Sequence, residues 1–238
     1  MSEVAPSVGG GAPAGRQLID EQRELGDESL AGRIIRDIVQ AAHELDPAAV
    51  QSQLEIGRTR LGLGACVDRI LLPAVGELHL LRASGQHDAA QDLLASEAVR
   101  SWLSRRSSLA PPPLDIGPIL LACGPRDRQT ITLESLALLL RFRCWPCRSL
   151  GARTSIFTLT VAAQAADAVG VVVISTDNRG RLAAGEALRA VDALGIPVFY
   201  AGKSFDAEHL RDHLPGRYLG SRMSDACAVL ITTLQPVT

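Results

Sequence analysis

The chain has 238 residues, of which 47% are hydrophobic and only 3% aromatic. This length accommodates one large domain or two small ones around an aliphatic core. The formal net charge of −2 gives no general attraction to nucleic acid or to an anionic membrane surface. Composition and charge therefore predict neither of these partners.

The cysteine pattern favours a reducing compartment. The cysteines are odd in number, and most of them lie in apolar runs: Cys66, Cys123, Cys144, Cys147 and Cys227. This suits free thiols better than a disulfide framework. The N-terminus does not have the pattern of a signal peptide, and the apolar runs are too short to span a bilayer. We expect a soluble, cytoplasmic protein.

The first part of the chain predicts a helical bundle. Residues 1–16 are mostly Gly, Ala, Pro and Ser, and they predict a disordered tail. Over residues 17–106 the apolar side chains recur at helical spacing, and Asp46 followed by Pro47 marks a helix start. The predicted helices lie around residues 30–39 and over Ala48–Leu61, Cys66–Leu81 and Asp88–Arg105. Four helices with short connections predict a bundle.

Residues 107–118 are rich in proline and predict a linker between domains. Strands then alternate with helices over residues 119–238. The predicted strands are Ile119–Cys123, Cys147–Leu150, Val171–Ser175, Pro197–Tyr200 and Tyr218–Leu219. The predicted helices are Leu133–Arg143, Ser155–Ala168, Arg181–Leu194, Asp206–Leu214 and Ser224–Leu234. This alternation predicts a doubly wound α/β domain with a five-stranded parallel sheet covered on both faces.

The stretch 119–132 (ILLACGPRDRQTIT) predicts a strand, a loop and the start of a helix. In an open parallel sheet, ligands bind beyond the carboxyl ends of the strands, and a helix N-terminus favours negative charge. Asp127, Arg128, Gln129 and Thr132 lie where a ligand would be held.

Several short motifs resemble one known family. They are Leu72–Leu78 (LPAVGEL), Ser96–Arg100, Ser149–Gly151, Ser175-Thr176, Val198–Gly202 and Tyr218–Gly220. Together with the order of bundle, linker and α/β domain, they resemble the cobalamin-binding modules of methionine synthase, corrinoid methyltransferase proteins and light-sensing adenosylcobalamin-dependent repressors. The resemblance implies a flavodoxin-like sheet domain with a ligand between it and the bundle. It also implies that Ser175, Thr176 and Gly202 lie in loops around that ligand.

The residues that hold cobalamin in this family differ here. The family signature is Asp-x-His-x-x-Gly, in which the His binds cobalt and the Asp orients it. The matching positions are Asp127, Gln129 and Thr132. Gln has no imidazole nitrogen, and Thr has a branched side chain where the family has Gly. Cobalamin is therefore disfavoured as the cofactor, although binding with its own benzimidazole base on cobalt remains an alternative.

The bundle side of the predicted pocket differs too. His79 stands where the repressors have a Trp over the cofactor, and Asp92 lies in the region of their Glu-His pair. His79 could ligate a metal, donate a hydrogen bond or cap a smaller cavity. The sequence predicts no other metal ligand: His209 and His213 could share one face of a predicted helix, but a solvated face is favoured there.

Two further patterns leave alternatives open. Arg126 and Arg128 flank Asp127 and would bind a carboxylate or phosphate, or would be solvated loop charges. Cys144 and Cys147 have the spacing of a redox pair, but they follow a helix instead of preceding one. They are either packing residues or a regulatory disulfide.

No nucleophile, phosphate-binding loop or paired carboxylate points to an enzyme. We expect a sensory or regulatory protein that binds a small molecule between the bundle and the α/β domain. It would signal through a protein partner or a homo-oligomer, with an indirect role in transcription because it lacks a DNA-binding domain. The alternatives are a corrinoid carrier of a methyltransferase and an interaction scaffold with an empty pocket.

Overall fold

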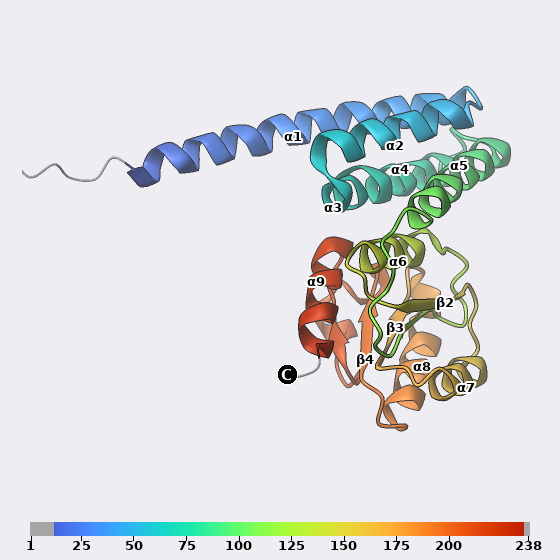
Figure 1. Cartoon of the computed structure of the whole chain (residues 1–238). Helices are drawn as coiled ribbons and strands as arrows, with labels where there is room; N and C mark the ends of the chain where they lie inside the picture. The colour runs from blue at the N-terminus through green and yellow to red at the C-terminus, as the bar shows by residue number, and fades with distance from the viewer. Residues whose placement is uncertain (1–11, 236–238) are drawn as a thin grey trace, which may run out of the picture.

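The computed structural model describes the backbone of residues 12–235 and the side chains of residues 26–235. A helical bundle forms its N-terminal half (Figure 1). The bundle consists of α1 (Ala12–His43), α2 (Pro47–Leu61), α3 (Leu63–Cys66), the π-helical turn η1 (Val67–Leu71), α4 (Leu72–Ala83) and α5 (Ala89–Ser107). Because α3, η1 and α4 are continuous, the bundle has four helical rods, as predicted.

Helix α1 corrects one expectation from the sequence. It begins at Ala12, so residues 12–16 are helical where the composition predicted a disordered tail. The rest of that predicted tail, residues 1–11, lies outside the described residues.

Side-chain caps fix the starts of two bundle helices. The Asp46 carboxylate accepts hydrogen bonds from the backbone N–H groups of Ala48 and Ala49 at the start of α2. At the start of α5, Asp88 and Gln91 form a reciprocal capping box. Each cap satisfies helix N–H groups that have no partner within the helix.

Pro73 lies inside the third rod without ending it. Proline has no N–H, and its ring clashes with the carbonyl four residues earlier. The π-helical turn of η1 precedes it, and the backbone N–H of Leu72 bonds to the carbonyl of Val67, five residues back. The wider turn accommodates the proline, so α4 continues to Ala83 and carries the bundle's contribution to the site.

The second half is an α/β domain. Its strands are β1 (Ile119–Cys123), β2 (Cys147–Gly151), β3 (Gly170–Ile174), β4 (Val198–Ala201) and β5 (Arg217–Tyr218). Its helices are α6 (Ile131–Phe142), α7 (Ile156–Ala165), α8 (Arg181–Asp192) and α9 (Met223–Leu234). All strand pairs are parallel, in the order β2-β1-β3-β4-β5. This is the flavodoxin-like order, and the predicted fold class is confirmed.

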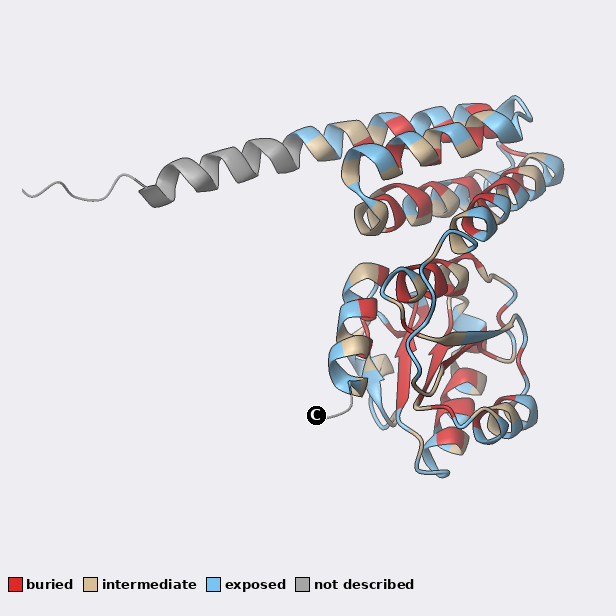
Figure 2. Ribbon diagram, viewed as in Figure 1, coloured by how far each residue is buried: buried red, intermediate tan, exposed pale blue. Residues whose placement is uncertain are grey.

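Helices cover both faces of the sheet. Alternate residues of the central strands pack against α6 and α9 on one face and against α7 and α8 on the other. All residues of β1 and β3 are buried, which is typical of inner strands in a parallel sheet (Figure 2). None of the described helices is long and apolar enough to cross a membrane.

The helix expected over Asp206–Leu214 is wrong. Within these residues the chain forms one short 3-10 turn, η4 (Glu208–Leu210), and another, η3 (Lys203–Phe205), directly precedes them. His213 adopts a positive φ of 63°, and Pro215 follows two residues later, which disfavours helix in the residue before it. His209 and His213 therefore do not share a helix face.

The two halves share apolar contacts. Ile131 and Leu138 belong to α6 but pack into the core of the bundle, while Val67 of η1 packs into the core on the α6 and α9 face of the sheet. Polar contacts add to this interface. The Asp68 carboxylate of η1 accepts hydrogen bonds from the backbone N–H of Met223 at 2.7 Å and of Ser224 at 3.1 Å, and from the Ser224 hydroxyl. A bundle residue thus caps α9 of the α/β domain.

Replacing this cap tests its contribution. We expect Asp68→Ala to lower the free energy of unfolding by about 1–2 kcal/mol, because the first N–H groups of α9 lose their acceptor. Urea denaturation measures this change. Glu97→Ala, which removes an exposed carboxylate from α5, is the matched control and should change stability by no more than about 0.5 kcal/mol. Equal effects of the two substitutions would contradict the capping role.

Candidate functional site

A cavity of about 640 Å³ lies between α4 of the bundle and the loops at the carboxyl ends of the strands. Its volume is within the range of about 300–1,000 Å³ typical of small-molecule sites. It also includes the loops after β1 and β3, where the strand order reverses, the usual ligand position in this class of sheet. The bundle therefore covers the part of the α/β domain where a ligand is expected.

One wall of the cavity is largely apolar and the other polar. The apolar lining residues are Leu72, Val75, Gly76, Leu80, Ile131 and Met223. The polar wall comes mostly from the loops after β1, β3, β4 and β5. Its residues are Gln129, Thr132, Thr176, Asp177, Asn178, Gly202, Lys203, Asp206 and Ser221, and His79 faces them from α4.

The structure separates the residues predicted from the sequence into two groups. Those that line the cavity are His79, Gln129, Thr132, Thr176 and Gly202. Those that do not are Asp92, Arg126, Asp127, Arg128 and Ser175. Arg126 and Arg128 are exposed. The anion-binding pair predicted from the sequence is therefore not among the residues that line the cavity.

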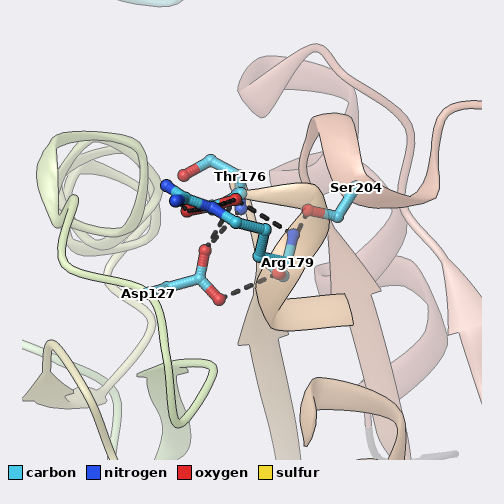
Figure 3. A network of polar contacts seen from close by, with 6 residues as sticks. Asp127, Thr176, Arg179 and Ser204 are labelled. Carbon is cyan, nitrogen blue, oxygen red and sulfur yellow. Dashed lines mark hydrogen bonds and ion pairs between the residues drawn. The ribbon is translucent and has the colours of Figure 1, made fainter. Parts of the chain in front are cut away.

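Asp127 does not line the cavity; its carboxylate bonds to the loop after β3 (Figure 3). It is 1% exposed. One carboxylate oxygen accepts from the Ser175 hydroxyl at 2.8 Å, and the other accepts from the backbone N–H of Thr176 at 2.8 Å and of Asp177 at 3.1 Å. The Ser175 hydroxyl oxygen also lies 3.1 Å from that of Ser204. The loop after β1 is thereby tied to the loops after β3 and β4.

Gly202 allows the β4 loop to pass directly against the β3 loop. Its φ is +106°, and an added Cβ would lie 2.2 Å from the Ser175 carbonyl oxygen. Both the backbone conformation and the close approach require a residue without a side chain. This contact positions Lys203, the next residue, at the edge of the cavity.

A polar contact crosses the cavity between the two halves of the protein. The Nε2 atoms of His79 and Gln129 lie 3.2 Å apart. In this orientation the Gln129 amide donates and His79 Nε2 accepts, which requires the His79 proton on Nδ1; the Nε2–H tautomer requires the amide turned round. The predicted bundle residue and the predicted sheet residue therefore contact each other directly.

Asp92 lies beside His79 and is paired with Arg82. It is 5% exposed, and one of its oxygens accepts from Arg82 Nη1 at 2.5 Å. The other oxygen lies 3.7 Å from His79 Nε2, without a hydrogen-bond partner among the described residues. Asp92 does not line the cavity, and its hydrogen bond is to Arg82.

The described cysteines are free thiols, and burial makes most of them unreactive. Burial raises the pKa of Cys66 and of Cys123 to about 12, and the pKa of Cys227 to about 11. It also raises the pKa of Cys147. These thiols are protonated at neutral pH, and the thiolate is the nucleophilic form. The 3% exposure of Trp145 favours the packing interpretation of the Cys144–Cys147 motif.

Potential metal ligands do not cluster among the residues of known placement. In that part of the chain no three His, Cys, Asp or Glu side chains gather as a metal site would require. The polar side chains near His79 Nε2 include Gln129, with its Nε2 at 3.2 Å, and Asp92, with its Oδ1 at 3.7 Å.

Comparison with solved structures identifies the fold. No protein-family model matches the chain, and neither does any curated protein. The monomethylamine corrinoid protein of Methanosarcina barkeri matches with a TM-score of 0.68 at 9% identity, covering 85% of this chain and 99% of that one. At this identity the match shows the fold alone, which is the two-part architecture of a corrinoid protein. The resemblance found in the sequence is confirmed at this level.

Two further structures match less closely. They are the methanol:cobalamin methyltransferase complex of Methanosarcina barkeri (TM-score 0.45, 16% identity, 87% of this chain and 81% of that one) and a cobalamin-binding protein of Desulfitobacterium hafniense (TM-score 0.47, 14% identity, 85% and 98%). With TM-scores below 0.5, neither carries an argument about this chain.

The site residues do not fit cobalamin held in the manner that the resemblance implies. Gln129 offers no imidazole to cobalt, and Asp127, which would orient that imidazole, is occupied by Ser175 and two backbone N–H groups. The contact between His79 and Gln129 also joins the two walls between which the corrin ring would have to lie.

Substitution of Gly202 tests the contact between the loops. We expect Gly202→Ala to lower the free energy of unfolding by about 3 kcal/mol or more, because it combines a positive φ with a clash against the Ser175 carbonyl. The control is Gly220→Ala, where φ is +82° but an added Cβ has no atom within 4 Å. That variant should lose only about 1–2 kcal/mol. Thermal and urea unfolding measure both, and equal losses would contradict the close approach.

Proposed function

We propose that this protein is a small-molecule-binding module that holds its ligand between the helical bundle and the α/β domain. The observation that carries the proposal is the cavity between α4 and the loops after β1, β3, β4 and β5. An apolar wall facing a wall of polar side chains is what an organic ligand with polar groups requires.

The contacts around the cavity support a ligand smaller than a corrinoid. His79 and Gln129 already satisfy each other across it, so the remaining space lies beside that contact, not between the two side chains. Asp127 and Gly202 hold the polar loops in place from behind. The loops are thus preorganised, which reduces the ordering cost of binding.

A corrinoid carrier of a methyltransferase is the second candidate, and the structural comparison favours it. The matched protein of Methanosarcina barkeri is a corrinoid protein, and this chain covers 99% of it. Because Gln129 replaces the histidine, the cofactor would have to keep its own base on cobalt, and the contact between Gln129 and His79 would have to separate.

Signalling is the less supported part of the expectation from the sequence. A role in transcription has no support in the fold comparison, so the proposal is limited to ligand binding. If the protein signals, the interface between α4 and the loops is where a bound ligand would change the position of the bundle, and a partner protein would read that position.

Filling the cavity tests the main proposal. We expect native mass spectrometry of the wild-type protein from its natural host to show a bound small molecule. Gly76→Trp should remove it, because Gly76 lines the cavity and a tryptophan there occupies the space. Glu77→Trp adds the same bulk to the exposed side of α4 and should retain the ligand. A wild-type protein of bare mass, or a ligand retained by Gly76→Trp, would contradict the proposal.

Restoring the family signature tests the corrinoid candidate. We expect the double variant Gln129→His, Thr132→Gly to bind hydroxocobalamin more tightly than the wild type, by tenfold or more, because it regains an imidazole ligand and the space beside it. Visible absorption after removal of free cofactor measures binding. A stoichiometric corrin band in the wild type would favour the carrier function, and a colourless wild type would contradict it.

A further inference from the structure

Lys203 is the only lysine among the 24 Lys and Arg residues of the chain. It lines the cavity, immediately after the β4 strand and Gly202. Lysine differs from arginine in presenting a compact point charge on a flexible stem, without the planar fork of a guanidinium. The one such side chain in this protein therefore lies at its candidate site.

The residues on either side of Lys203 are buried, and the Lys203 side chain extends from them toward α4. Its neighbours Gly202, Ser204 and Phe205 are buried, and Phe205 is 0% exposed. The backbone N–H of Ser204 bonds to the Ser175 carbonyl at 3.3 Å. Lys203 itself is exposed, and its Nζ lies 3.8 Å from the position that a Cβ would take at Gly76 of α4. The ammonium group thus reaches across the cavity to the bundle wall.

The other charged lining residues already have partners. The Asp177 carboxylate binds Arg179, with Nη2 and Oδ2 2.9 Å apart, and this contact lowers the pKa of Asp177. The Asp206 carboxylate accepts a hydrogen bond from the Tyr218 hydroxyl at 2.7 Å. Within residues 26–235, Lys203 has neither an ion pair nor a side-chain hydrogen bond. Lys203 is the one Lys or Arg side chain that lines the cavity, and its charge is unpaired within the described residues.

The wall opposite the polar loops is apolar. Leu72, Val75 and Leu80 of α4 line it, and Leu80 is 72% exposed. Ile131 and Met223 continue the apolar surface on the α/β side. A ligand that covers this wall gains about 25 cal/mol for each Å² of apolar surface removed from water.

We propose that the cavity binds an amphipathic anion, with its carboxylate or phosphate group on Lys203 and its apolar body against the α4 wall. This inference rests on the proposed function and specifies its ligand class. An ammonium–anion contact gives orientation, and the apolar wall gives the larger part of the affinity. Asp177 and Asp206 limit the anion to one position, next to Lys203.

The single lysine allows a direct test. Reductive methylation with ¹³C-formaldehyde labels only Lys203 and the chain's N-terminal amine, and it keeps the positive charge of the lysine. Each dimethylamine gives its own NMR signal. We expect octanoate or octyl phosphate to shift the Lys203 signal saturably, while octanol does not and the N-terminal signal stays in place. The two anions separate a carboxylate ligand from a phosphate ligand.

Variants test the charge itself. Lys203→Met keeps an unbranched apolar stem without the charge, and it should weaken binding of the preferred anion in equilibrium dialysis by tenfold or more. Lys203→Arg should stay within a few-fold of the wild type. Urea unfolding of both variants checks that they are folded, and unchanged midpoints are expected because Lys203 is exposed.

The outcomes separate this inference from the proposed function. Octanol binding as tightly as octanoate, or full binding by Lys203→Met, would overturn the anion inference while leaving a small-molecule site. No saturable shift with either anion at millimolar concentration would overturn it too. If native mass spectrometry also shows the wild-type protein without a bound small molecule, the proposed function is contradicted as well.

Discussion

The arrangement of the candidate site depends on one buried carboxylate. Asp127 connects the loop after β1 to the loop after β3 through Ser175 and two backbone N–H groups. A buried acceptor of this kind is costly to leave unpaired, so its three donors are held in one geometry. Gly202 then packs the third loop against the same β3 loop. The polar wall of the cavity is therefore fixed before any ligand arrives.

The hydrogen bonds of this carboxylate do not depend on a histidine at position 129. In the family that the sequence resembles, the aspartate orients a histidine ligand. Here its donors are all within the loops, so the aspartate has a structural use that does not involve the position of Gln129. Gln129 supplies no imidazole for cobalt, and the loops keep their hydrogen bonds without one. The geometry of the loops at this site therefore does not require a cobalt-binding histidine.

The sequence predicted the fold well because its strongest signals are local. Five consecutive apolar residues in β1 and β3 identify inner strands, and the capping residue Asp46 marks a helix start. The prediction failed over residues 206–214, where spacing alone suggested a helix but the positive φ of His213 requires turns. Long-range contacts, such as the cap that Asp68 provides to α9, had no local signal at all.

Prediction of the site was less complete, for a similar reason. The position of the motif predicted that Asp127 and Gln129 both line the pocket, but only Gln129 does. Asp127 is buried and bonds to the backbone of Asp177, 50 residues further along the chain, so its orientation depends on a contact that has no local signal in the sequence. The sequence analysis missed Lys203, Asp177 and Asp206 as lining residues. For Lys203 a signal existed, because a single lysine follows a predicted strand and a glycine. No comparable signal marked the two aspartates.

The apolar contacts shared by the bundle and the α/β domain involve few of the residues that line the cavity. Ile131, Leu138 and Val67 hold the two halves together by apolar contact, whether or not the cavity is filled. Of these three, Ile131 also lines the cavity, whereas Leu138 and Val67 do not. His79, Gln129 and Thr132 line the cavity and belong to none of the described apolar clusters. Replacing these three side chains would change the lining and leave the apolar contacts of Leu138 and Val67 between bundle and α/β domain in place.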